Sequence, residues 1–320
     1  MAEKIVSIVT PCYNGENYLD RFFQSILSQT YPALELVFVN DGSTDQTEKK
    51  VNAYREQFQK KGIPLIYIRQ ENTGQAAALN AGLKKFKGSY LACMDSDDEL
   101  LPDAIEKKVQ CLEAHPEAAF CYGKAIAVNE EEPDRIVHIY GKRESSHSFF
   151  EDVLFAHDVF FPGYLIRTDA FDQVLPGREI YTGRGGQNAQ ILLPMGWYYG
   201  EPMYVEESVY KYFIRQNSHS RSINTSSKII EQLNYYEKTL IESIQKIQDP
   251  KAQKYIPKVR EHYARLRFGN AVDTMDPEII RREYFKLKQL HIASLHDLAM
   301  YLKYVLLKRE IPDHAHKNKE

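Results

Sequence analysis

The chain has 320 residues, of which 43% are hydrophobic, and its formal net charge is −3. A chain of this length and apolar content can bury a sizeable core, which predicts a soluble globular protein with one large domain and an appendage. The near balance of 41 Lys and Arg with 44 Asp and Glu excludes nucleic acid as the default partner and also excludes an acidic, disordered activator.

The N-terminus and the cysteines predict where the protein is located. The first apolar run is short and is broken at Pro11, so it predicts neither a signal sequence nor a membrane span. The four cysteines show neither CxxC spacing nor the pattern of a disulfide framework. Buried thiols in a reducing compartment fit this usage, so we expect a cytoplasmic protein.

Short β-branched runs alternate with segments of helical period over the first 98 residues. Strands with their exit loops are predicted at 4–14, 34–45, 64–70 and 88–98, and helices at 18–28, at 45–61 and within 72–88. This alternation predicts βαβ units and therefore an α/β fold with a mostly parallel sheet flanked by helices. A polar loop follows each strand, and ligands of open α/β sheets bind at the carboxyl ends of the strands.

The fourth predicted strand leads directly into a cluster of acids in the stretch LACMDSDDEL, residues 91–100. Alternate residues of an extended stretch point the same way, so Asp95 and Asp97 can converge. Two carboxylates at a strand end suit a Mg²⁺ or Mn²⁺ ion that carries a diphosphate. In the alternative interpretation the stretch only starts a helix, with Asp97 or Asp98 as its cap and Glu99 in the first turn.

Three segments in chain order resemble the family 2 glycosyltransferases, which have the Rossmann-like GT-A fold. They are VTPCYNGENYLDRFFQSILSQTYPALELVFVNDGSTDQT, NTGQAAALNAG and MDSDDEL. The resemblance covers about the first 220 residues and is strong over about the first 110. It implies a GT-A domain at 1–224, with a nucleotide-binding half to about 110 and an acceptor half at 111–224. It also implies transfer of a sugar from a nucleotide diphosphate donor, usually with inversion at the anomeric carbon.

The resemblance further implies which residues bind the donor. The nucleotide-sugar site would contain Thr10, Pro11, Tyr13, Asn14, Asp41, Asn80, Asp95, Ser96, Arg215 and Arg221. Asp41 would accept a hydrogen bond from the imide N–H of uracil, which cytosine lacks, so a UDP-sugar is the preferred donor. Asp95 and Asp97 match the family's DxD pair of metal ligands, and His219 would be the third ligand unless it is an ordinary exposed loop histidine. Many relatives have Arg before the residue equivalent to Asn80, where this chain has Leu79.

The acceptor half departs from the family pattern. Family members open a helix here with a Glu-Asp pair whose Asp takes the acceptor proton, whereas this chain has Gln187 and Asn188. An amide has negligible proton affinity and cannot act as a general base. We expect a hydroxyl acceptor that these two amides hold by hydrogen bonds, with a carboxylate from elsewhere in the chain, Asp158, as the base.

The two amides at this helix start also allow different interpretations. The base could be Glu206 or Glu207, or the acceptor could be a polyprenyl phosphate that needs no base. The alignment could also be shifted by one turn, or transfer could be weak or lost. His157, next to Asp158, is a further acceptor-side candidate, with an ordinary loop histidine as the alternative.

From about residue 225 to residue 320 the pattern is wholly helical, with breaks at 249–250, at 275–277 and near 291. The last predicted helix combines leucines with Lys303, Lys308 and Arg309, which suits a peripheral contact with the inner face of a membrane. Packing on the catalytic domain or on a second subunit is the alternative.

Taken together, the sequence predicts a metal-dependent, inverting glycosyltransferase that uses a UDP-sugar and acts on a saccharide or lipid-linked acceptor. Assembly of a surface polysaccharide or glycolipid is the role that the resemblance implies. A sugar nucleotidyltransferase is a competing class, but the loop TPCYNGEN lacks the Lys and Arg that such an enzyme needs after its first strand. A sugar-nucleotide-binding protein that has lost catalysis is the non-enzyme alternative.

Overall fold

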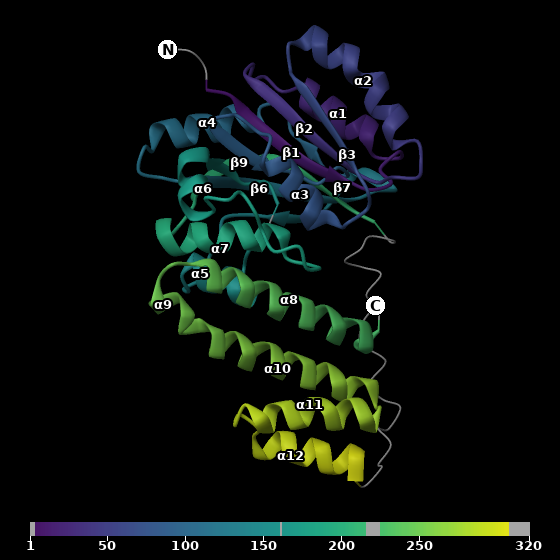
Figure 1. Cartoon of the computed structure of the whole chain (residues 1–320), viewed down its shortest axis with the longest axis vertical. Coiled ribbons are helices and arrows are strands. Elements are labelled where there is room, and N and C mark those ends of the chain that lie inside the picture. The colour runs from purple at the N-terminus through teal and green to yellow at the C-terminus, as the bar shows by residue number, and fades with distance from the viewer. Residues whose placement is uncertain (1–3, 161, 216–224, 307–320) are drawn as a thin grey trace.

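The fold consists of an α/β body and a stack of helices (Figure 1). The structure is a computed structural model, and it describes residues 4–160, 162–215 and 225–306. The strands are β1 (Val6–Cys12), β2 (Leu34–Asp41), β3 (Leu65–Gln70), β4 (Tyr90–Cys93), β5 (Glu99–Leu100), β6 (Phe120–Asn129), β7 (Glu132–Tyr140), β8 (Leu165–Arg167) and β9 (Met203–Ile214). Within the described residues these strands form one sheet in the order β3-β2-β1-β4-β8-β6-β9-β5, with β7 paired to β6.

The helices of the α/β body alternate with its strands. They are α1 (Leu19–Leu27), α2 (Thr47–Lys61), α3 (Gln75–Leu83), α4 (Ala104–Ala114), α5 (Phe149–Phe155), α6 (Thr168–Val174) and α7 (Gln187–Tyr199). The remaining helices are α8 (Ser226–Lys246), α9 (Pro250–Gln253), α10 (Tyr255–Thr274), α11 (Pro277–Gln289), α12 (Leu295–Tyr301) and the π-helical turn η1 (Leu302–Leu306).

The first four strands form the predicted parallel part of the sheet. β1 pairs in parallel with both β2 and β4, and β2 pairs in parallel with β3. The second half of the sheet is mixed, because β8 runs antiparallel to β4 and β6 while β9 runs parallel to β6. The loops that follow β1, β2, β3 and β4 therefore leave the same edge of the sheet, as the sequence predicts.

Apolar residues cover both faces of the sheet. Every residue of β1 and β2 is buried, and neighbours along β1 point to opposite sides. Val9 joins a cluster with residues of α3, α5 and α7, whereas Ile8 joins a second cluster with residues of α1, α2 and α4. The helices on the two faces thus hold the parallel strands, and with them the polar loops, in fixed positions.

Helix α3 lies close to the sheet because its inner face is small. A Cβ atom on Gly82 would lie 2.5 Å from Cγ1 of Val9 and 3.2 Å from Cγ2 of Val39. Any larger residue there would push the helix away from β1. This close packing brings the first residue of α3, Gln75, to the edge where β4 ends.

The helices after residue 225 extend away from the α/β body (Figure 1). Helix α8 packs on α7 and on α10, and α11 packs on α10. The breaks fall where the sequence predicts them, since Asp249 and Asp276 cap α9 and α11 and a proline follows each cap. Among the described residues no helix combines the length and apolar content that crossing a bilayer needs.

A buried lysine lies in the core of the α/β body. Lys108 of α4 is 0% exposed, and its Nζ donates a hydrogen bond to the carbonyl oxygen of Gly163 at 3.1 Å. Burial lowers the pKa of its ammonium group to about 8. The unfolded chain therefore binds more protons than the folded one between pH 8 and 10.5, and the free energy of unfolding rises with pH across that window.

Replacing this lysine is expected to stabilise the protein. At pH 7 the buried charge costs about 3 kcal/mol, so Lys108→Met should raise the free energy of unfolding by about 2 kcal/mol, the remainder being lost with the hydrogen bond to Gly163. The variant should also lose the rise in stability between pH 8 and 10.5, which urea unfolding at several pH values would measure. Lys107→Met is the matched control, because this neighbour pairs with Asp103 at the surface. Equal stability of the Lys108 variant and the native chain at pH 7 would contradict the prediction.

Candidate active site at the carboxyl edge of the sheet

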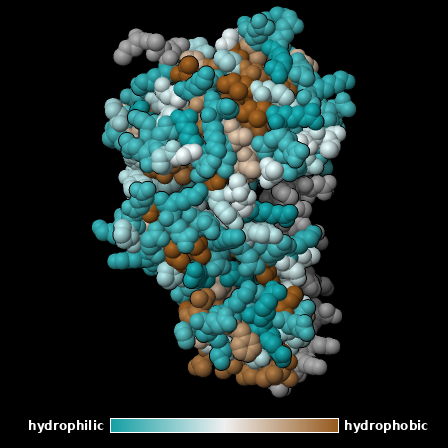
Figure 2. Space-filling view, viewed as in Figure 1, coloured by the Kyte–Doolittle hydropathy of each residue, from teal (hydrophilic) through white to brown (hydrophobic). Residues whose placement is uncertain are grey.

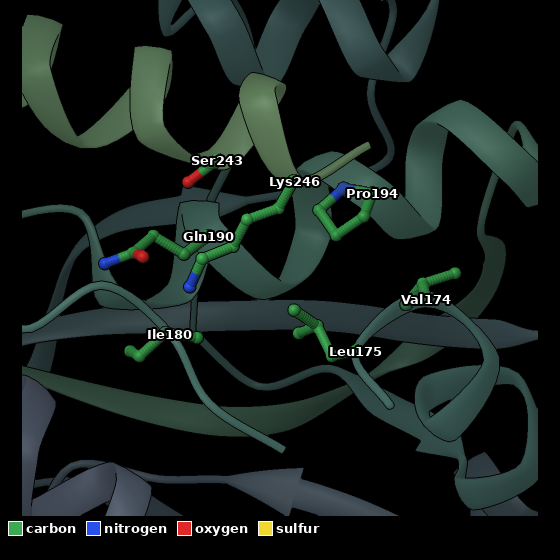
Figure 3. Close-up of a pocket in the computed structure, with 7 residues that line it drawn as sticks. All are labelled: Val174, Leu175, Ile180, Gln190, Pro194, Ser243 and Lys246. Carbon is green, nitrogen blue, oxygen red and sulfur yellow. The ribbon is translucent and has the colours of Figure 1, made fainter. Parts of the chain in front are cut away.

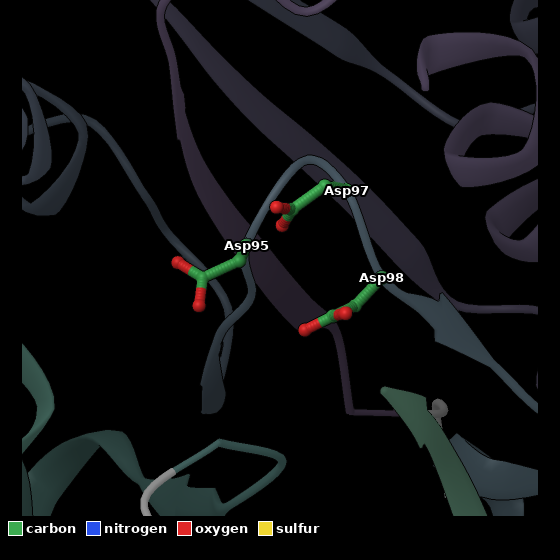
Figure 4. A group of neighbouring side chains, drawn as sticks. All are labelled: Asp95, Asp97 and Asp98. Atoms are coloured by element: carbon green, nitrogen blue, oxygen red, sulfur yellow. The ribbon is translucent and has the colours of Figure 1, made fainter. Parts of the chain in front are cut away.

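Three carboxylates gather in the loop after β4 (Figure 4). One oxygen from each of Asp95, Asp97 and Asp98 lies within 4.8 Å of the others. β4 and the following β5 hold the two ends of this loop, and β5 pairs with β9 through Glu99 and Leu100. Among the described residues, this is the one group of three or more acids, histidines or cysteines close enough to share a metal ion.

Asp98 anchors the loop to β9. It is 1% exposed, and it accepts hydrogen bonds from the hydroxyl of Tyr210 at 2.7 Å and from the backbone N–H of Phe213 at 3.1 Å. Burial, together with the nearby Asp95, raises its pKa to about 8. The helix-start interpretation of this stretch is wrong, because α4 begins only at Ala104 and residues 99–100 form a strand.

The contacts of Asp98 predict a difference between two variants. Asp98→Ala should lower the free energy of unfolding by about 3 kcal/mol, because it leaves the hydroxyl of Tyr210 and the N–H of Phe213 buried without an acceptor. Asp98→Asn keeps an oxygen and a nitrogen in place and should stay within about 1 kcal/mol of the native chain. Urea unfolding of the two variants compares them directly, and equal losses in both would show that the hydrogen bonds do not hold the loop.

Asp95 and Asp97 have different surroundings. Asp95 accepts a hydrogen bond from Nε2 of Gln75 at 3.0 Å, and burial raises the pKa of its carboxyl group. Asp97 forms an ion pair with Arg215, and its backbone carbonyl accepts two hydrogen bonds from Arg21, at 2.7 and 3.1 Å. The predicted convergence of Asp95 and Asp97 is present, although a turn at residues 96–97 produces it and not an extended stretch. Gln75 and Arg21 are neighbours that sequence reasoning missed.

Arg215 lies at the end of β9, directly over the acidic loop. Its guanidinium carbon is 4.3 Å from the ring centre of Tyr18, and that of Arg21 is 5.1 Å from the same ring. The structure therefore brings Arg215 beside the acids. His219 and Arg221, the other two residues predicted from this segment, lie outside the described residues.

The loops after β1 and β2 are tied together. Asn14 has a left-handed backbone (φ 52°), and its side-chain oxygen accepts a hydrogen bond from the N–H of Thr44 at 2.9 Å. Tyr13 beside it is 52% exposed. Thr10 and Pro11 belong to β1 itself, and the fully buried Thr10 hydroxyl has no partner among the described residues. Of the four residues at positions 10–14 that the sequence predicts to bind the nucleotide, Tyr13 and Asn14 thus lie in the loop after β1.

The carboxylate of Asp41 is largely occupied by its own neighbours. It accepts hydrogen bonds from Nε2 of Gln70 at 2.8 Å and from the backbone N–H groups of Thr73 and Gly74 at 3.0 and 2.9 Å. A carboxylate offers about four acceptor positions, so roughly one is left for a ligand. Asp41 is 2% exposed, and Gln70 is a neighbour that the sequence did not indicate.

Two further residues that were predicted to bind the nucleotide sugar, Asn80 and Ser96, make contacts with residues other than the three aspartates. The amide of Asn80 donates to the carbonyl of Ile180 and accepts from its N–H, both at 2.9 Å, and the residue is 9% exposed. Asn80 therefore ties α3 to the segment before α7. Ser96, within the acidic loop, contacts the thiol of Cys12, whose burial raises its pKa to about 11.

The predicted acceptor residues lie on separate elements. Gln187 and Asn188 are half-buried in the first turn of α7, after Gly186 with φ 71°. Asp158 has a left-handed backbone (φ 43°), and one of its carboxylate oxygens accepts a hydrogen bond from the N–H of Glu144 at 2.5 Å. His157 is exposed, with its Nδ1 4.0 Å from the buried Asp152.

Asp158 borders an open depression of about 630 Å³. Its lining is polar and consists of Lys142, Glu144, Ser145, Ser146, His147, His157 and Asp158. The loop that carries Asp158 continues to Phe160, whose ring lies 6.0 Å from that of Tyr210, the residue that holds Asp98. This ring contact links the loop that carries Asp158 to the residue of β9 that holds Asp98.

Two other places in the fold are poor candidates for the chemistry. Glu206 and Glu207 are exposed in a bulge of β9, and a strand rise of about 3.3 Å per residue puts them roughly 20 Å from Phe213, where Asp98 binds.

A cavity between α6, α7 and α8 (Figure 3) has a volume of only about 10 Å³, which is room for one water molecule. Its lining residues are Val174, Leu175, Ile180, Gln190, Pro194, Ser243 and Lys246.

Comparison with known proteins agrees with this geometry. Residues 7–175, more than half of the chain, match the model of the family described as "Glycosyl transferase family 2". The chain belongs to glycosyl transferase family 2. This membership confirms the resemblance seen in the sequence and sets aside the nucleotidyltransferase alternative.

Curated glycosyltransferases share part of their length with the chain. It is 30% identical over 227 residues to the glycosyltransferase GlyA of Streptococcus pneumoniae, which covers 68% of the chain and 31% of that protein. It is 32% identical over 135 residues to the putative teichuronic acid biosynthesis glycosyltransferase TuaG of Bacillus subtilis, covering 42% of the chain and 52% of TuaG. The chain thus spans about a third of GlyA and about half of TuaG.

Solved structures of glycosyltransferases share the GT-A type fold. Staphylococcus aureus TarS 1–349 in complex with UDP-GlcNAc superposes with a TM-score of 0.62 at 18% identity, over 95% of this chain and 91% of that one. The mannosyltransferase PcManGT of Pyrobaculum calidifontis, in complex with GDP-Man and Mn²⁺, superposes with a TM-score of 0.54 at 18% identity, over 94% and 79%. The α/β fold with C-terminal helices that the sequence predicts is therefore confirmed.

Proposed function

We propose that the protein transfers a sugar from a UDP-sugar to a saccharide or lipid-linked acceptor, with inversion at the anomeric carbon. The observation that carries this proposal is the cluster of Asp95, Asp97 and Asp98 at the carboxyl edge of a parallel sheet, beside Arg215. Acids and an arginine at that edge suit a cation and a diphosphate. Family membership and the nucleotide sugars bound to TarS and PcManGT support the same class of donor.

The donor set of this loop fits a hard divalent cation, Mn²⁺ or Mg²⁺. The carboxylates lie close together. Burial raises the pKa values of both Asp95 and Asp98, and the nearby Asp95 adds to the rise at Asp98, so a bound cation would stabilise the charged forms of these acids. Asp95 and Asp97 would hold the ion with His219, whereas both oxygens of Asp98 already accept hydrogen bonds. When bound, the cation supplies positive charge that stabilises the departing diphosphate. PcManGT with its Mn²⁺ supports this assignment.

The remaining donor residues divide by the part of the donor that they contact. Asp41, with one acceptor position left, would bind the imide N–H of uracil, and the exposed ring of Tyr13 would pack near the base. Arg215, with Arg221, would offset the charge that develops on the leaving UDP. Asn80 would act indirectly, by fixing α3 and with it Gln75 beside Asp95.

In the transfer step an acceptor hydroxyl oxygen attacks the anomeric carbon from the face opposite the diphosphate. The bond to the acceptor forms as the bond to UDP breaks, and the acceptor proton passes to the carboxylate of Asp158. The strained backbone of Asp158 and its place on the open depression support this role. Gln187 and Asn188 would hold the acceptor by hydrogen bonds, with His157 beside it.

We further propose that the reaction contributes to a surface polysaccharide or glycolipid, which the likeness to TuaG supports. A cytoplasmic location fits the four cysteines, all of which are free thiols. In this proposal residues 1–224 form the catalytic domain, divided near residue 110 into donor and acceptor halves, and residues 225–320 form a helical appendage.

A panel of UDP-sugars and GDP-sugars, each with Mn²⁺ or with a chelator, tests the proposal. We expect slow hydrolysis of one UDP-sugar, which requires the metal and accelerates when an acceptor oligosaccharide is supplied. Binding of a nucleotide sugar without turnover under any condition would favour the sugar-nucleotide-binding alternative. Turnover that is equally fast with a chelator would contradict the metal assignment.

A further inference from the structure

The far end of the helical stack exposes a row of leucines. Leu295, Leu298, Leu302 and Leu306, which we call the leucine stripe, are 85%, 36%, 38% and 56% exposed. They recur at helical spacing along α12 and η1, while Asp297, Tyr304 and Val305 of the same segment are buried. Figure 2 shows the apolar colour gathered over this end of the molecule.

Neighbouring side chains widen this apolar surface. Phe285 and Leu290, at the C-terminal end of α11, are 47% and 37% exposed. Helix α12 packs against α11, so these residues belong to the same end of the helical stack. Single exposed leucines are common on soluble proteins, but a contiguous apolar row on one helix marks a surface that another body covers.

The charges of this end are predominantly positive. Residues 277–306 carry the five basic residues Arg281, Arg282, Lys286, Lys288 and Lys303 and the three acidic residues Glu278, Glu283 and Asp297. Two of the acids are satisfied internally, because the buried Glu283 pairs with Arg267, Arg282 and Lys286, and Asp297 caps α12 through Ser294. Glu278 is the one acid of this range at the surface, so the exposed charge of residues 277–306 is mainly positive.

We propose that the leucine stripe docks on an anionic lipid surface, with α12 lying in the plane of the membrane. An apolar row flanked by basic side chains is the pattern that inserts leucines between acyl chains and pairs cations with anionic headgroups. A second copy of the chain fits less well, since a symmetric contact between two such ends would bring the same basic residues together. The α/β body lies at the opposite end of the molecule from α12, so this contact leaves it clear of the membrane (Figure 1).

Sedimentation of the full chain with lipid vesicles tests this proposal. Two compositions are compared, phosphatidylcholine alone and phosphatidylcholine mixed with phosphatidylglycerol in equal parts. We expect binding to the mixed vesicles that weakens as salt is raised, and markedly weaker binding to phosphatidylcholine alone. Leu295→Glu combined with Leu302→Glu should lower partition into the mixed vesicles about tenfold or more, and Lys288→Glu should lower it less.

Ile139→Glu is the matched control, because Ile139 on β7 is 51% exposed and belongs to the α/β body. It should leave vesicle binding unchanged, and thermal unfolding checks that all variants are folded. No binding to the mixed vesicles, or equal binding by the leucine double variant, would overturn the proposal. Dimerisation of the native chain that the double variant abolishes, seen by analytical centrifugation without lipid, would overturn it as well. The vesicle binding and the dimerisation can both be measured without knowing the donor sugar.

Discussion

Asp97→Asn is expected to lower kcat about 10³-fold or more while the protein stays folded. The substitution removes one of the two carboxylates that would hold the cation, and it breaks the ion pair that keeps Arg215 over the loop. The leaving diphosphate should therefore lose the stabilisation that the cation supplies and also that from Arg215. Product formation from the UDP-sugar that the native chain turns over is the measurement.

Asp134→Asn provides the control for this variant. Asp134 is an exposed acid on β7, so its substitution removes the same charge without touching the loop after β4. Its kcat should equal that of the native chain. A kcat of Asp97→Asn within tenfold of the native value would show that the acidic loop only connects β4 to β5.

Asp158→Asn is expected to lower kcat by about 10²- to 10⁴-fold, the usual contribution of a general base, and to leave the KM for the donor unchanged. A carboxylate that takes the acceptor proton also produces an acidic limb in the pH profile of kcat, and this limb should disappear in the variant. A purely structural role for Asp158 would leave the limb in place. Full transfer kinetics against pH therefore test the role itself.

Glu144→Gln is the matched control, because Glu144 borders the same depression and holds Asp158 only through its backbone N–H. It should change kcat little. If Asp158→Asn keeps the native kcat and its pH profile, the assignment of the base is wrong. An acceptor that is already ionised, such as a polyprenyl phosphate, would then account for a helix α7 that opens with Gln187 and Asn188.

The parallel half of the fold was predictable from the sequence because its signals are local. The first three strands are short runs that contain β-branched residues, and the fourth is a short apolar run. Polar residues follow each strand, so the parallel pairing and the shared edge follow from general rules. The convergence of Asp95 and Asp97 was predicted from alternation along an extended stretch. In the structure a turn at residues 96–97 brings the two carboxylates together instead. The family motifs cover the same residues, so the physical pattern and the resemblance agree there.

The contacts that complete the site come from distant parts of the chain, and the sequence carried no signal for them. Asp98 is held by Tyr210 and Phe213, more than a hundred positions away, so local patterns also allowed it to be a helix cap. Gln70 reaches Asp41 because the ends of β2 and β3 pair, and the backbone of residues 73–74 reaches it from the loop after β3. The spacing of the leucines in α12 likewise predicts an apolar face, but whether that face is covered depends on how α11 and α12 pack.

Calorimetric titration of the protein with UDP, with and without Mn²⁺, tests the central claim most directly. We expect that UDP binds tightly only when the metal is present, that GDP binds more weakly, and that Asp97→Asn loses the metal-dependent part of the UDP affinity. UDP binding that is indifferent to both Mn²⁺ and Asp97, or no nucleotide binding at all, would contradict the assignment of this loop as a cation and diphosphate site.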